Sequence, residues 1–167
     1  MVRKKTGVLW VSVSGESVAE TINTYWYFCE KENKKPDKVL LLHPSTKIVD
    51  KDKYLHGFIT VSGKFNKKKK TTVNCIDYKN ESIKDFLKKT TTLMKDAKKD
   101  NLKIIFDVSP TLHGFIPAVL YNLAIKFNPL ADTMFYTEYS KPEYRQRFYP
   151  LIPKNEFQVY NIFNELS

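Results

Sequence analysis

The sequence predicts an α/β fold with a mostly parallel central sheet, helices on both faces of that sheet, and a C-terminal antiparallel hairpin. Three observations carry this prediction. Short apolar runs alternate along the chain with segments whose apolar residues recur at helical spacing. Some of these runs are apolar at every position, which is typical of parallel strands buried on both faces. Two extended segments then follow one another near the C-terminus, which favours a hairpin. The order of elements is that of a Rossmann-like sandwich.

Length and composition indicate one globular domain spanning residues 1–167, with 42% hydrophobic content to fill a core. No apolar run approaches the roughly 18 residues of a membrane-spanning helix, so no membrane partner is expected. The N-terminal segment also lacks the uninterrupted apolar stretch of a signal peptide, and we expect a cytoplasmic protein. Cys29 and Cys75 are too few for a disulfide framework or a zinc cluster, and we expect both to be reduced.

The chain is basic, with 28 Lys and Arg against 18 Asp and Glu and a formal net charge of +10. This excess favours polyanionic partners such as nucleic acids or nucleotides, through long-range attraction. A lysine-rich protein with well-solvated surfaces would have the same charge. The run from Lys67 to Lys70 predicts a solvated loop tip, with a contact to a phosphate backbone as the alternative.

The first part of the chain reads as two strands joined by a helix. Residues 7–13 form the first predicted strand. Ser17 and Glu20 then give the S-x-x-E spacing of a capping box, which predicts the start of a helix. Helical spacing of apolar residues continues to Cys29, and residues 38–43 form a second strand with continuous apolar character.

The middle of the chain is less regular. The segment 44–70 predicts a short helix and an irregular strand around residues 58–61, and Ser82 is placed to cap a longer helix. A further helix is predicted from Pro117, because proline suits the first helical turn. Two more buried strands are predicted over residues 71–78 and 102–107. The apolar stripe of the helix after Ser82 comprises Ile83, Phe86, Leu87, Leu93, Met94 and Ala97.

The C-terminal part predicts the closing hairpin from residues 131–139 and 148–152, the second strand ending at Pro153. The apolar segment 157–163 reads equally well as a last core helix or as part of a dimer interface. No internal repeat or second domain is visible.

Several signatures of known sites are missing. The first strand is followed by V-S-G-E-S and not by G-x-G-x-x-G, so the nicotinamide and flavin fingerprint is absent. Neither a P-loop nor a G-x-S-x-G motif occurs. The three histidines, His43, His56 and His113, lack metal-ligand spacing, and neither a metal nor a cofactor is predicted.

Two strand-to-helix turns rich in hydroxyl groups are the candidate site. Small side chains let backbone N–H groups approach a phosphate, and a helix N-terminus favours an anion. In an open α/β sheet both turns lie at the carboxyl edge, where ligands bind. Ordinary helix capping is the alternative explanation. The first turn comprises Ser12, Ser14, Gly15, Glu16 and Ser17, and the second comprises Ser109, Pro110, Thr111, Leu112, His113 and Gly114.

The order of V-S-V-S-G-E-S, a helix, K-P-D-K-V-L-L-L-H-P-S, then I-I-F-D-V-S-P-T-L-H-G and a closing M-F-Y-T-E-Y…Y-P-L-I-P resembles the CRISPR-associated Rossmann-fold (CARF) domains. The resemblance covers nearly the whole chain. It implies that the two turns, with His43, bind the cyclic oligoadenylate messenger of type III CRISPR defence (cA4 or cA6) across a homodimer. The family's second turn usually reads D-x-T-G-G, then a small residue and Lys or Arg. Here it runs from Asp107 to Gly114 without paired glycines.

The resemblance implies either cleavage of the messenger or binding of the messenger without cleavage. A ring nuclease cleaves the messenger without a metal, by attack of a ribose 2′-hydroxyl on its adjacent phosphate. We expect this activity, with His113 as general acid or base and with Ser14 and Lys141 assisting; Lys47 is a weaker candidate for charge stabilisation.

Two alternatives stay open beside the ring nuclease. A non-catalytic sensor or sponge would bind the ring intact. We expect this chain itself to have no room for an effector, so a sensor could also be a fragment of a larger effector. A basic nucleic-acid-binding protein is the third reading. It would use aromatic and basic residues for stacking and charge contacts, namely Tyr136, Tyr139, Tyr144, Arg145, Arg147 and Tyr149.

Overall fold

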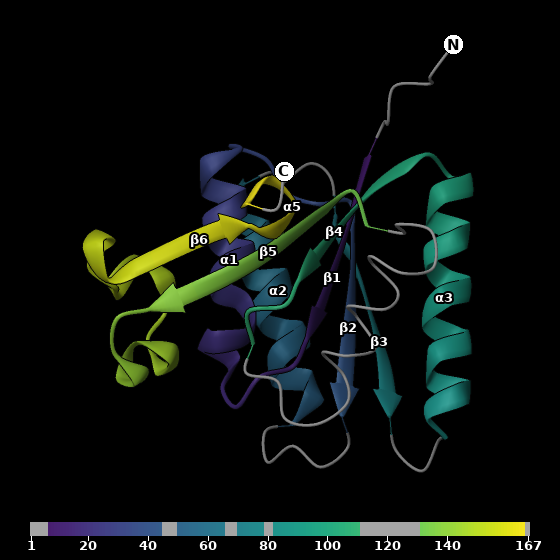
Figure 1. The fold of residues 1–167 in the computed structure, drawn as a ribbon, viewed down its shortest axis with the longest axis horizontal. Coiled ribbons are helices and arrows are strands. Elements are labelled where there is room, and N and C mark those ends of the chain that lie inside the picture. The colour runs from purple at the N-terminus through teal and green to yellow at the C-terminus, as the bar shows by residue number, and fades with distance from the viewer. Residues whose placement is uncertain (1–6, 45–49, 66–69, 79–81, 111–130, 166–167) are drawn as a thin grey trace.

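The computed structural model describes residues 7–44, 50–65, 70–78, 82–110 and 131–165. Its centre is a six-stranded sheet in the order β3-β2-β1-β4-β5-β6 (Figure 1). The first five strands are parallel and the sixth pairs antiparallel with β5, which confirms the predicted sheet and hairpin. The strands are β1 (Gly7–Val13), β2 (Lys38–Pro44), β3 (Thr72–Tyr78), β4 (Leu102–Asp107), β5 (Thr133–Tyr139) and β6 (Phe157–Asn161).

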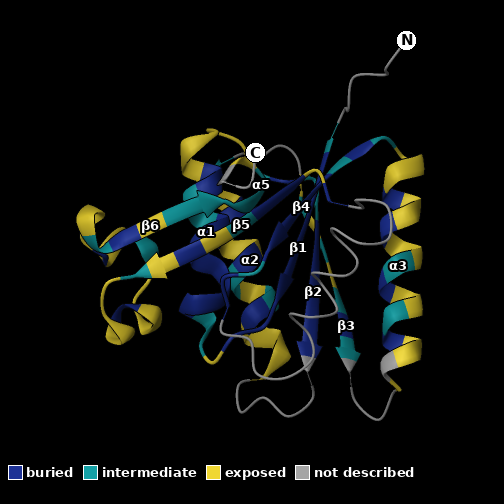
Figure 2. Ribbon diagram, in the orientation of Figure 1, coloured by how far each residue is buried: buried dark blue, intermediate teal, exposed yellow. Residues whose placement is uncertain are grey.

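Helices cover both faces of the sheet, as predicted. The helices α1 (Val18–Lys31) and α2 (Lys51–Phe65) pack on one face, and α3 (Ile83–Lys99) lies on the other (Figure 1). Figure 2 shows the three central strands, β1, β2 and β4, buried along most of their length, whereas the outward side of α3 is exposed. Both faces of the inner strands therefore need apolar side chains, which explains the continuous apolar runs in the sequence.

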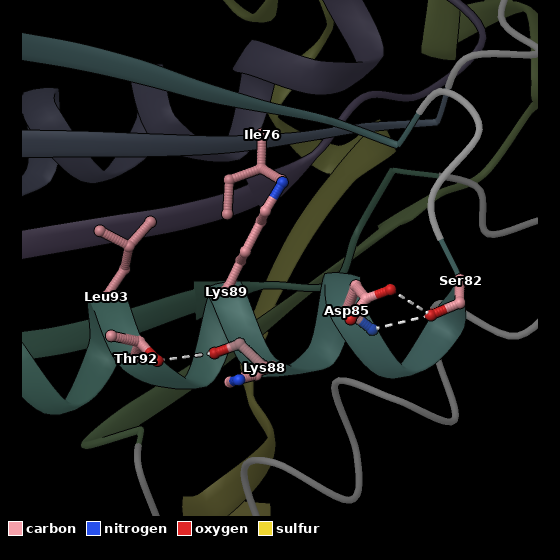
Figure 3. A pocket seen from close by; sticks show the side chains of 7 residues that line it. All are labelled: Ile76, Ser82, Asp85, Lys88, Lys89, Thr92 and Leu93. Atoms are coloured by element: carbon pink, nitrogen blue, oxygen red, sulfur yellow. Dashed lines mark hydrogen bonds between the residues drawn. The ribbon is translucent and has the colours of Figure 1, made fainter.

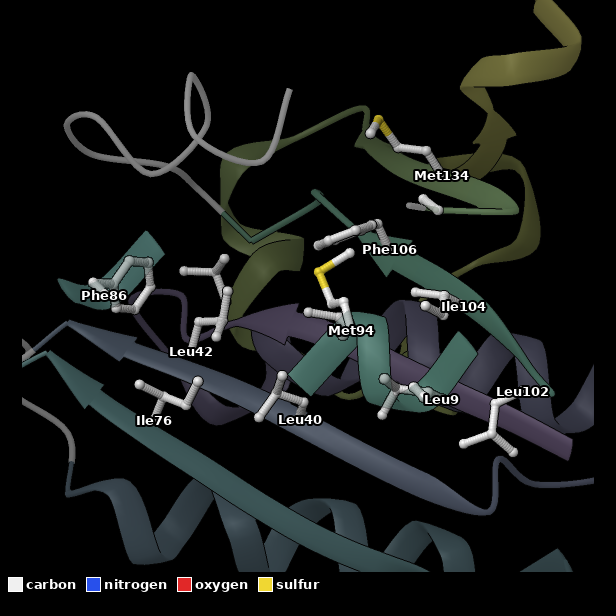
Figure 4. Close-up of a cluster of buried hydrophobic side chains, with 14 residues drawn as sticks. Leu9, Leu40, Leu42, Ile76, Phe86, Met94, Leu102, Ile104, Phe106 and Met134 are labelled. Carbon is white, nitrogen blue, oxygen red and sulfur yellow. The ribbon is translucent and has the colours of Figure 1, made fainter. Parts of the chain in front are cut away.

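Side chains alternate between the two faces along each strand and build two separate cores. The core under α3 takes Leu9, Val11 and Val13 from β1 and is completed by Phe86 and Met94 of α3 (Figure 4). The core under α1 and α2 is centred on the fully buried Trp10. Its indole lies edge-on to Tyr25, with ring centroids 5.4 Å apart, and Tyr25 lies edge-on to Phe58 at 5.0 Å. Alternate side chains of β1 therefore belong to the cores on the two faces of the sheet.

The ends of α1 follow directly from local sequence. Ser17 is the N-cap, and its side-chain oxygen accepts a hydrogen bond from the Glu20 N–H at 3.0 Å. Asn33 has a φ of 48° just beyond the helix. There Asn33 and Lys34 donate their N–H groups to the Glu30 and Cys29 carbonyls, the pattern of a Schellman motif.

Two aspartates fix the starts of the parallel strands. Asp37, just before β2, accepts a hydrogen bond from the Val8 N–H at 2.8 Å and donates its own N–H to the Val8 carbonyl at 3.0 Å. Asp132, just before β5, makes the same pair of bonds with Ile104, both at 2.8 Å. Each aspartate therefore sets the register of one strand against its neighbour.

The structure corrects the sequence prediction at residues 58–61, which lie inside α2 and not in a strand. Gly57 and the β-branched residues after it locally resemble a strand. Over a longer stretch the pattern is helical, because Tyr54, Phe58 and Val61 recur at helical spacing and are all buried. On α3, Leu93 is 43% exposed and so lies off the predicted apolar stripe.

The second strand of the hairpin was also predicted in the wrong place. Residues 148–152 contain a short 3-10 helix, Tyr149–Leu151, because Pro150 and Pro153 cannot donate to a ladder. The strand is β6, and it is followed by the short helix α5 (Ile162–Glu165), so the segment 157–163 is not a core helix. The helix predicted from Pro117 and residues 67–69 of the lysine run lie outside the described residues.

We expect Leu42→Ala to lower the free energy of unfolding by about 2–5 kcal/mol, because Leu42 is fully buried in the core under α3. Leu151→Ala is the matched control: this side chain is 69% exposed, so the change should stay within about 0.5 kcal/mol. Urea unfolding of the three proteins measures both. Equal losses would contradict the described core.

Candidate functional site

The strand order places a topological switch point between β1 and β4. The chain leaves β1 toward β2 on one side, and β4 lies on the other side of β1. Ligands of open α/β sheets bind beyond the carboxyl ends of the strands at such a point. Ser12 of β1 is in register with Asp107 of β4, so the two predicted turns start side by side.

Within the first turn, the structure brings Ser14 and His43 together. Ser14 is fully buried, and its hydroxyl lies 2.9 Å from Nδ1 of His43 at the end of β2. The imidazole packs near Tyr54, with ring centroids 5.7 Å apart, and the Tyr54 hydroxyl donates to the Gly15 carbonyl at 2.8 Å. Elements β1, β2 and α2 therefore hold this hydroxyl–imidazole pair in place.

A carboxylate of the chain itself lies on the same turn. Oε2 of Glu20 accepts a hydrogen bond from the Glu16 N–H at 2.7 Å, and the Gly15 N–H donates to the Thr21 hydroxyl at 2.8 Å. Glu20 is only 1% exposed, and its Oε1 lies 4.0 Å from Nη1 of Arg145. The turn thus holds an anion at a helix N-terminus, where the partial positive charge favours one.

Gly15 is required by this close approach and not by its backbone angles. A Cβ at this position would lie 2.3 Å from Oε2 of Glu20, far inside van der Waals contact. The glycine in V-S-G-E-S therefore makes room for the Glu20 carboxylate.

A buried polar chain ends at Asp107 on the second turn. The Thr137 hydroxyl lies 2.8 Å from Oγ1 of Thr24, which donates to Oγ of Ser109 at 2.9 Å. Ser109 donates both its hydroxyl and its N–H to Oδ1 of Asp107. Oδ2 of Asp107 has no hydrogen-bond partner among the described residues.

Complete burial raises the pKa of Asp107 from its ordinary value of 3.8 to about 7. The hydrogen bonds from Ser109 oppose that shift because they favour the ionised carboxylate. A carboxyl group at the switch point therefore titrates near neutral pH, which is a feature of functional sites.

The loop between β5 and β6 packs over the N-terminal turns of α1. The Ser17 hydroxyl donates to the Arg145 carbonyl at 3.0 Å. Asn23 donates to the Arg147 carbonyl and accepts from the Tyr149 N–H, both at 2.8 Å. These bonds bring Arg145 to the first turn, although it is distant in sequence.

The remaining predicted residues are divided between the site and the surface. Ser12 and Pro110 are buried at the switch point, and Glu16 is exposed on the first turn. Lys141 is exposed on the loop after β5, with its ammonium 5.9 Å from the centre of the Tyr144 ring. Four residues of the second turn and one minor candidate lie outside the described residues: Thr111, Leu112, His113, Gly114 and Lys47.

Thr24 and Asp107 were not among the candidate site residues predicted from the sequence. Glu20 was named only as part of a capping box, and Arg145 only for the nucleic-acid-binding alternative. The first turns of α1 carry several polar residues. Such a helix end is usually solvated, so burial of these residues is not expected from the sequence. In the structure Glu20, Asn23 and Thr24 are buried, because the loop after β5 covers them. Nothing in the local sequence indicates that cover.

A cavity of about 690 Å³ lies away from the switch point, between α3 and β3 (Figure 3). Its lining hydroxyl groups, those of Ser82 and Thr92, are engaged within α3. Oγ of Ser82 accepts from the Asp85 N–H at 3.1 Å, and the Thr92 hydroxyl donates to the Lys88 carbonyl at 2.8 Å. The first bond caps the N-terminus of α3, and the second links two residues of the same helix. We therefore do not assign this cavity to the candidate functional site.

No protein-family model matches the sequence, and no curated protein is found to be similar to it. Among the described residues, no group of three or more His, Cys, Asp or Glu side chains is placed to hold a metal ion. Within the same part of the chain, no helix has the length and apolar character needed to cross a membrane.

Asp107 should make stability depend on pH in an identifiable way. From pH 3.8 to about 7 the folded protein keeps a proton on Asp107 that the unfolded chain has released. Unfolding then releases a proton, so the free energy of unfolding falls as pH rises through this window, by up to about 1.4 kcal/mol per pH unit. The cost is absent below the window and complete above it.

The isosteric variant Asp107→Asn should lack this component. We therefore expect the stability of the variant relative to the natural chain to rise steadily between pH 4 and pH 7 in urea unfolding. A constant difference across that range would show that Asp107 does not carry the raised pKa.

Gly15→Ala should displace the Glu20 carboxylate and destabilise the protein by about 1–3 kcal/mol, as for other overpacked buried sites. In a Glu20→Ala background the added methyl group meets no carboxylate. The same change should then cost less than about 0.5 kcal/mol, giving a large coupling in the double-mutant cycle. An equal loss of stability from Gly15→Ala in the two backgrounds would contradict this explanation of Gly15.

Proposed function

We propose that this chain binds a cyclic oligoadenylate, cA4 or cA6, at the carboxyl edge of β1 and β4. The observation that carries the proposal is the strand order, because its switch point lies beside the first turn and the described start of the second turn, to which the CARF resemblance assigns the ring. The net charge of +10 supports it, since a basic surface attracts a polyanionic ring from solution.

The Glu20 carboxylate indicates how a phosphate would be held. It occupies the Glu16 N–H at the N-terminus of α1, the place where an anionic ligand is favoured. A ring phosphate would take over this N–H and the neighbouring Arg145, whose side chain is 45% exposed. An arginine offers a phosphate two parallel hydrogen bonds, which an isolated lysine cannot.

The proposal includes a homodimer, as the resemblance implies. A ring with two-fold symmetry presents equivalent phosphates to equivalent turns of two copies, and a two-fold interface brings the same surface of each copy to one ligand.

Cleavage of the ring is a second candidate function, favoured by the Ser14–His43 pair at 2.9 Å. The 2′-oxygen of a ribose would attack its adjacent phosphorus, the P–O5′ bond would break, and a 2′,3′-cyclic phosphate would form. His43 would take the proton of the 2′-hydroxyl, and a second acid would return a proton to O5′. Ser14 is fully buried, so its role would be to orient the imidazole. His113 and Lys141 remain the other predicted groups.

The binding test is calorimetric titration with cyclic tetra- and hexa-adenylate. We expect one ring size to bind, and Arg145→Ala to weaken it about tenfold or more, the value of a charge-assisted hydrogen bond. Lys154→Ala is the control, because it removes one positive charge from the far end of the same loop.

Chromatography of the same mixtures in EDTA separates the two functions. Linear products with 2′,3′-cyclic phosphate ends, abolished by His43→Asn with binding retained, would support a ring nuclease. An intact ring would support a sensor or sponge. If neither ring binds while linear RNA does, the proposal fails and the basic nucleic-acid-binding reading replaces it.

A further inference from the structure

A groove with a volume of about 510 Å³ lies between α1 and α2, on the outer side of that helical layer and apart from the switch point. Its floor is a stripe of α1, formed by Val18, Ile22 and Trp26 at four-residue spacing. The opposite side is α2, which comes close because Gly57 has no side chain. A Cβ there would lie 3.1 Å from Cγ1 of Val18 and 3.4 Å from Ile22.

The third side of the groove is the loop between β5 and β6, held by a buried amide. Asn23 bonds the carbonyl of Arg147 and the N–H of Tyr149, so it clamps the backbone on both sides of Phe148. The Phe148 ring stands near Trp26, with ring centroids 6.4 Å apart. The groove is therefore formed in advance by the fold, as ligand sites usually are.

The lining combines an apolar surface with one sign of charge. Phe148 is 41% and Leu151 69% exposed, which is unusual for side chains of this size in one small area. The ionisable lining groups are Lys53, His56 and Lys64, and none of the described lining residues is acidic. The Lys64 ammonium lies 4.2 Å from the centre of the Trp26 ring, directly over the apolar floor.

We propose that this groove binds a small amphipathic carboxylate with an aliphatic body, at a place separate from the one proposed for cyclic oligoadenylate. The hydrocarbon lies on the floor made by Val18, Ile22 and Trp26, and the carboxylate meets Lys64 and Lys53. Besides the ionisable Lys53, His56 and Lys64, the side-chain hydrogen-bonding groups among the described lining residues are the Thr60 hydroxyl and the indole N–H of Trp26. A nucleobase would leave most of its polar edge without hydrogen bonds there, whereas a hydrocarbon chain has no polar group to leave unpaired. The volume lies in the usual range for a small-molecule site.

The test is calorimetric titration of the whole chain with dodecanoate below its micelle concentration. We expect saturable binding of dodecanoate, and binding at least about tenfold weaker for dodecylammonium, which has the same body and the opposite charge. Lys64→Met should weaken dodecanoate about tenfold, the value of one charged contact. Lys95→Met is the matched control: it removes the same charge from α3, on the other face of the sheet, and should change nothing.

A second variant and a local readout keep the proposal falsifiable. Leu151→Glu adds a negative charge at an exposed rim position, so it should weaken dodecanoate without affecting the fold. A brominated aliphatic carboxylate should quench the fluorescence of Trp26, and Trp26→Phe should abolish that quenching although Trp10 remains. Equal affinity for dodecanoate and dodecylammonium, or quenching that survives in Trp26→Phe, would overturn the proposal. So would binding of an acidic amphipathic peptide without binding of dodecanoate.

Discussion

The structure depends on one constraint: β1 is hydrogen-bonded on both sides and buried on both faces. It pairs in parallel with β2 and with β4. A chain that joins two parallel strands must return along a face of the sheet, usually as a helix. Its side chains alternate between two cores, with Trp10 under α1 and α2, and Val11 under α3. Because all neighbours of β1 run in its direction, their loops meet at one edge. The candidate site is a consequence of that geometry.

The two edges of the sheet differ in how polar groups are used. At the amino edge, Asp37 and Asp132 each satisfy backbone groups of an adjacent strand and so stabilise the register. At the carboxyl edge, Asp107 and Glu20 are buried carboxylates beside loops, and the pKa of Asp107 is raised by its burial. One Asp107 oxygen has no hydrogen-bond partner among the described residues, and burying such a carboxyl group lowers stability, whereas an apolar side chain at the end of β4 would not. Groups retained at such a cost are typical of functional sites.

The sequence predicted the elements whose signal is local. Continuous apolar runs identified β1, β2 and β4, and the S-x-x-E pattern identified the start of α1, because burial on both faces and helix capping act within a few residues. It predicted a strand in the second half of α2 and misplaced β6, because β-branched or proline-flanked segments locally resemble the wrong element. It found the first turn through its Ser and Gly residues and named Glu20 as part of a capping box, but it did not place Arg145 beside the Glu20 carboxylate. That approach exists because the β5–β6 loop, more than a hundred residues away, covers the N-terminus of α1.

The β5–β6 loop belongs to both sites described above. Arg145 lies beside Glu20 at the first turn, whereas Phe148 and Leu151 wall the groove between α1 and α2. Asn23 bonds the loop backbone between these two parts, so neither part can shift far without straining the same amide. A ligand that moves the loop at one site must therefore change affinity at the other. By thermodynamic linkage the change is equal in both directions, and it is limited by how differently each ligand binds the two loop positions.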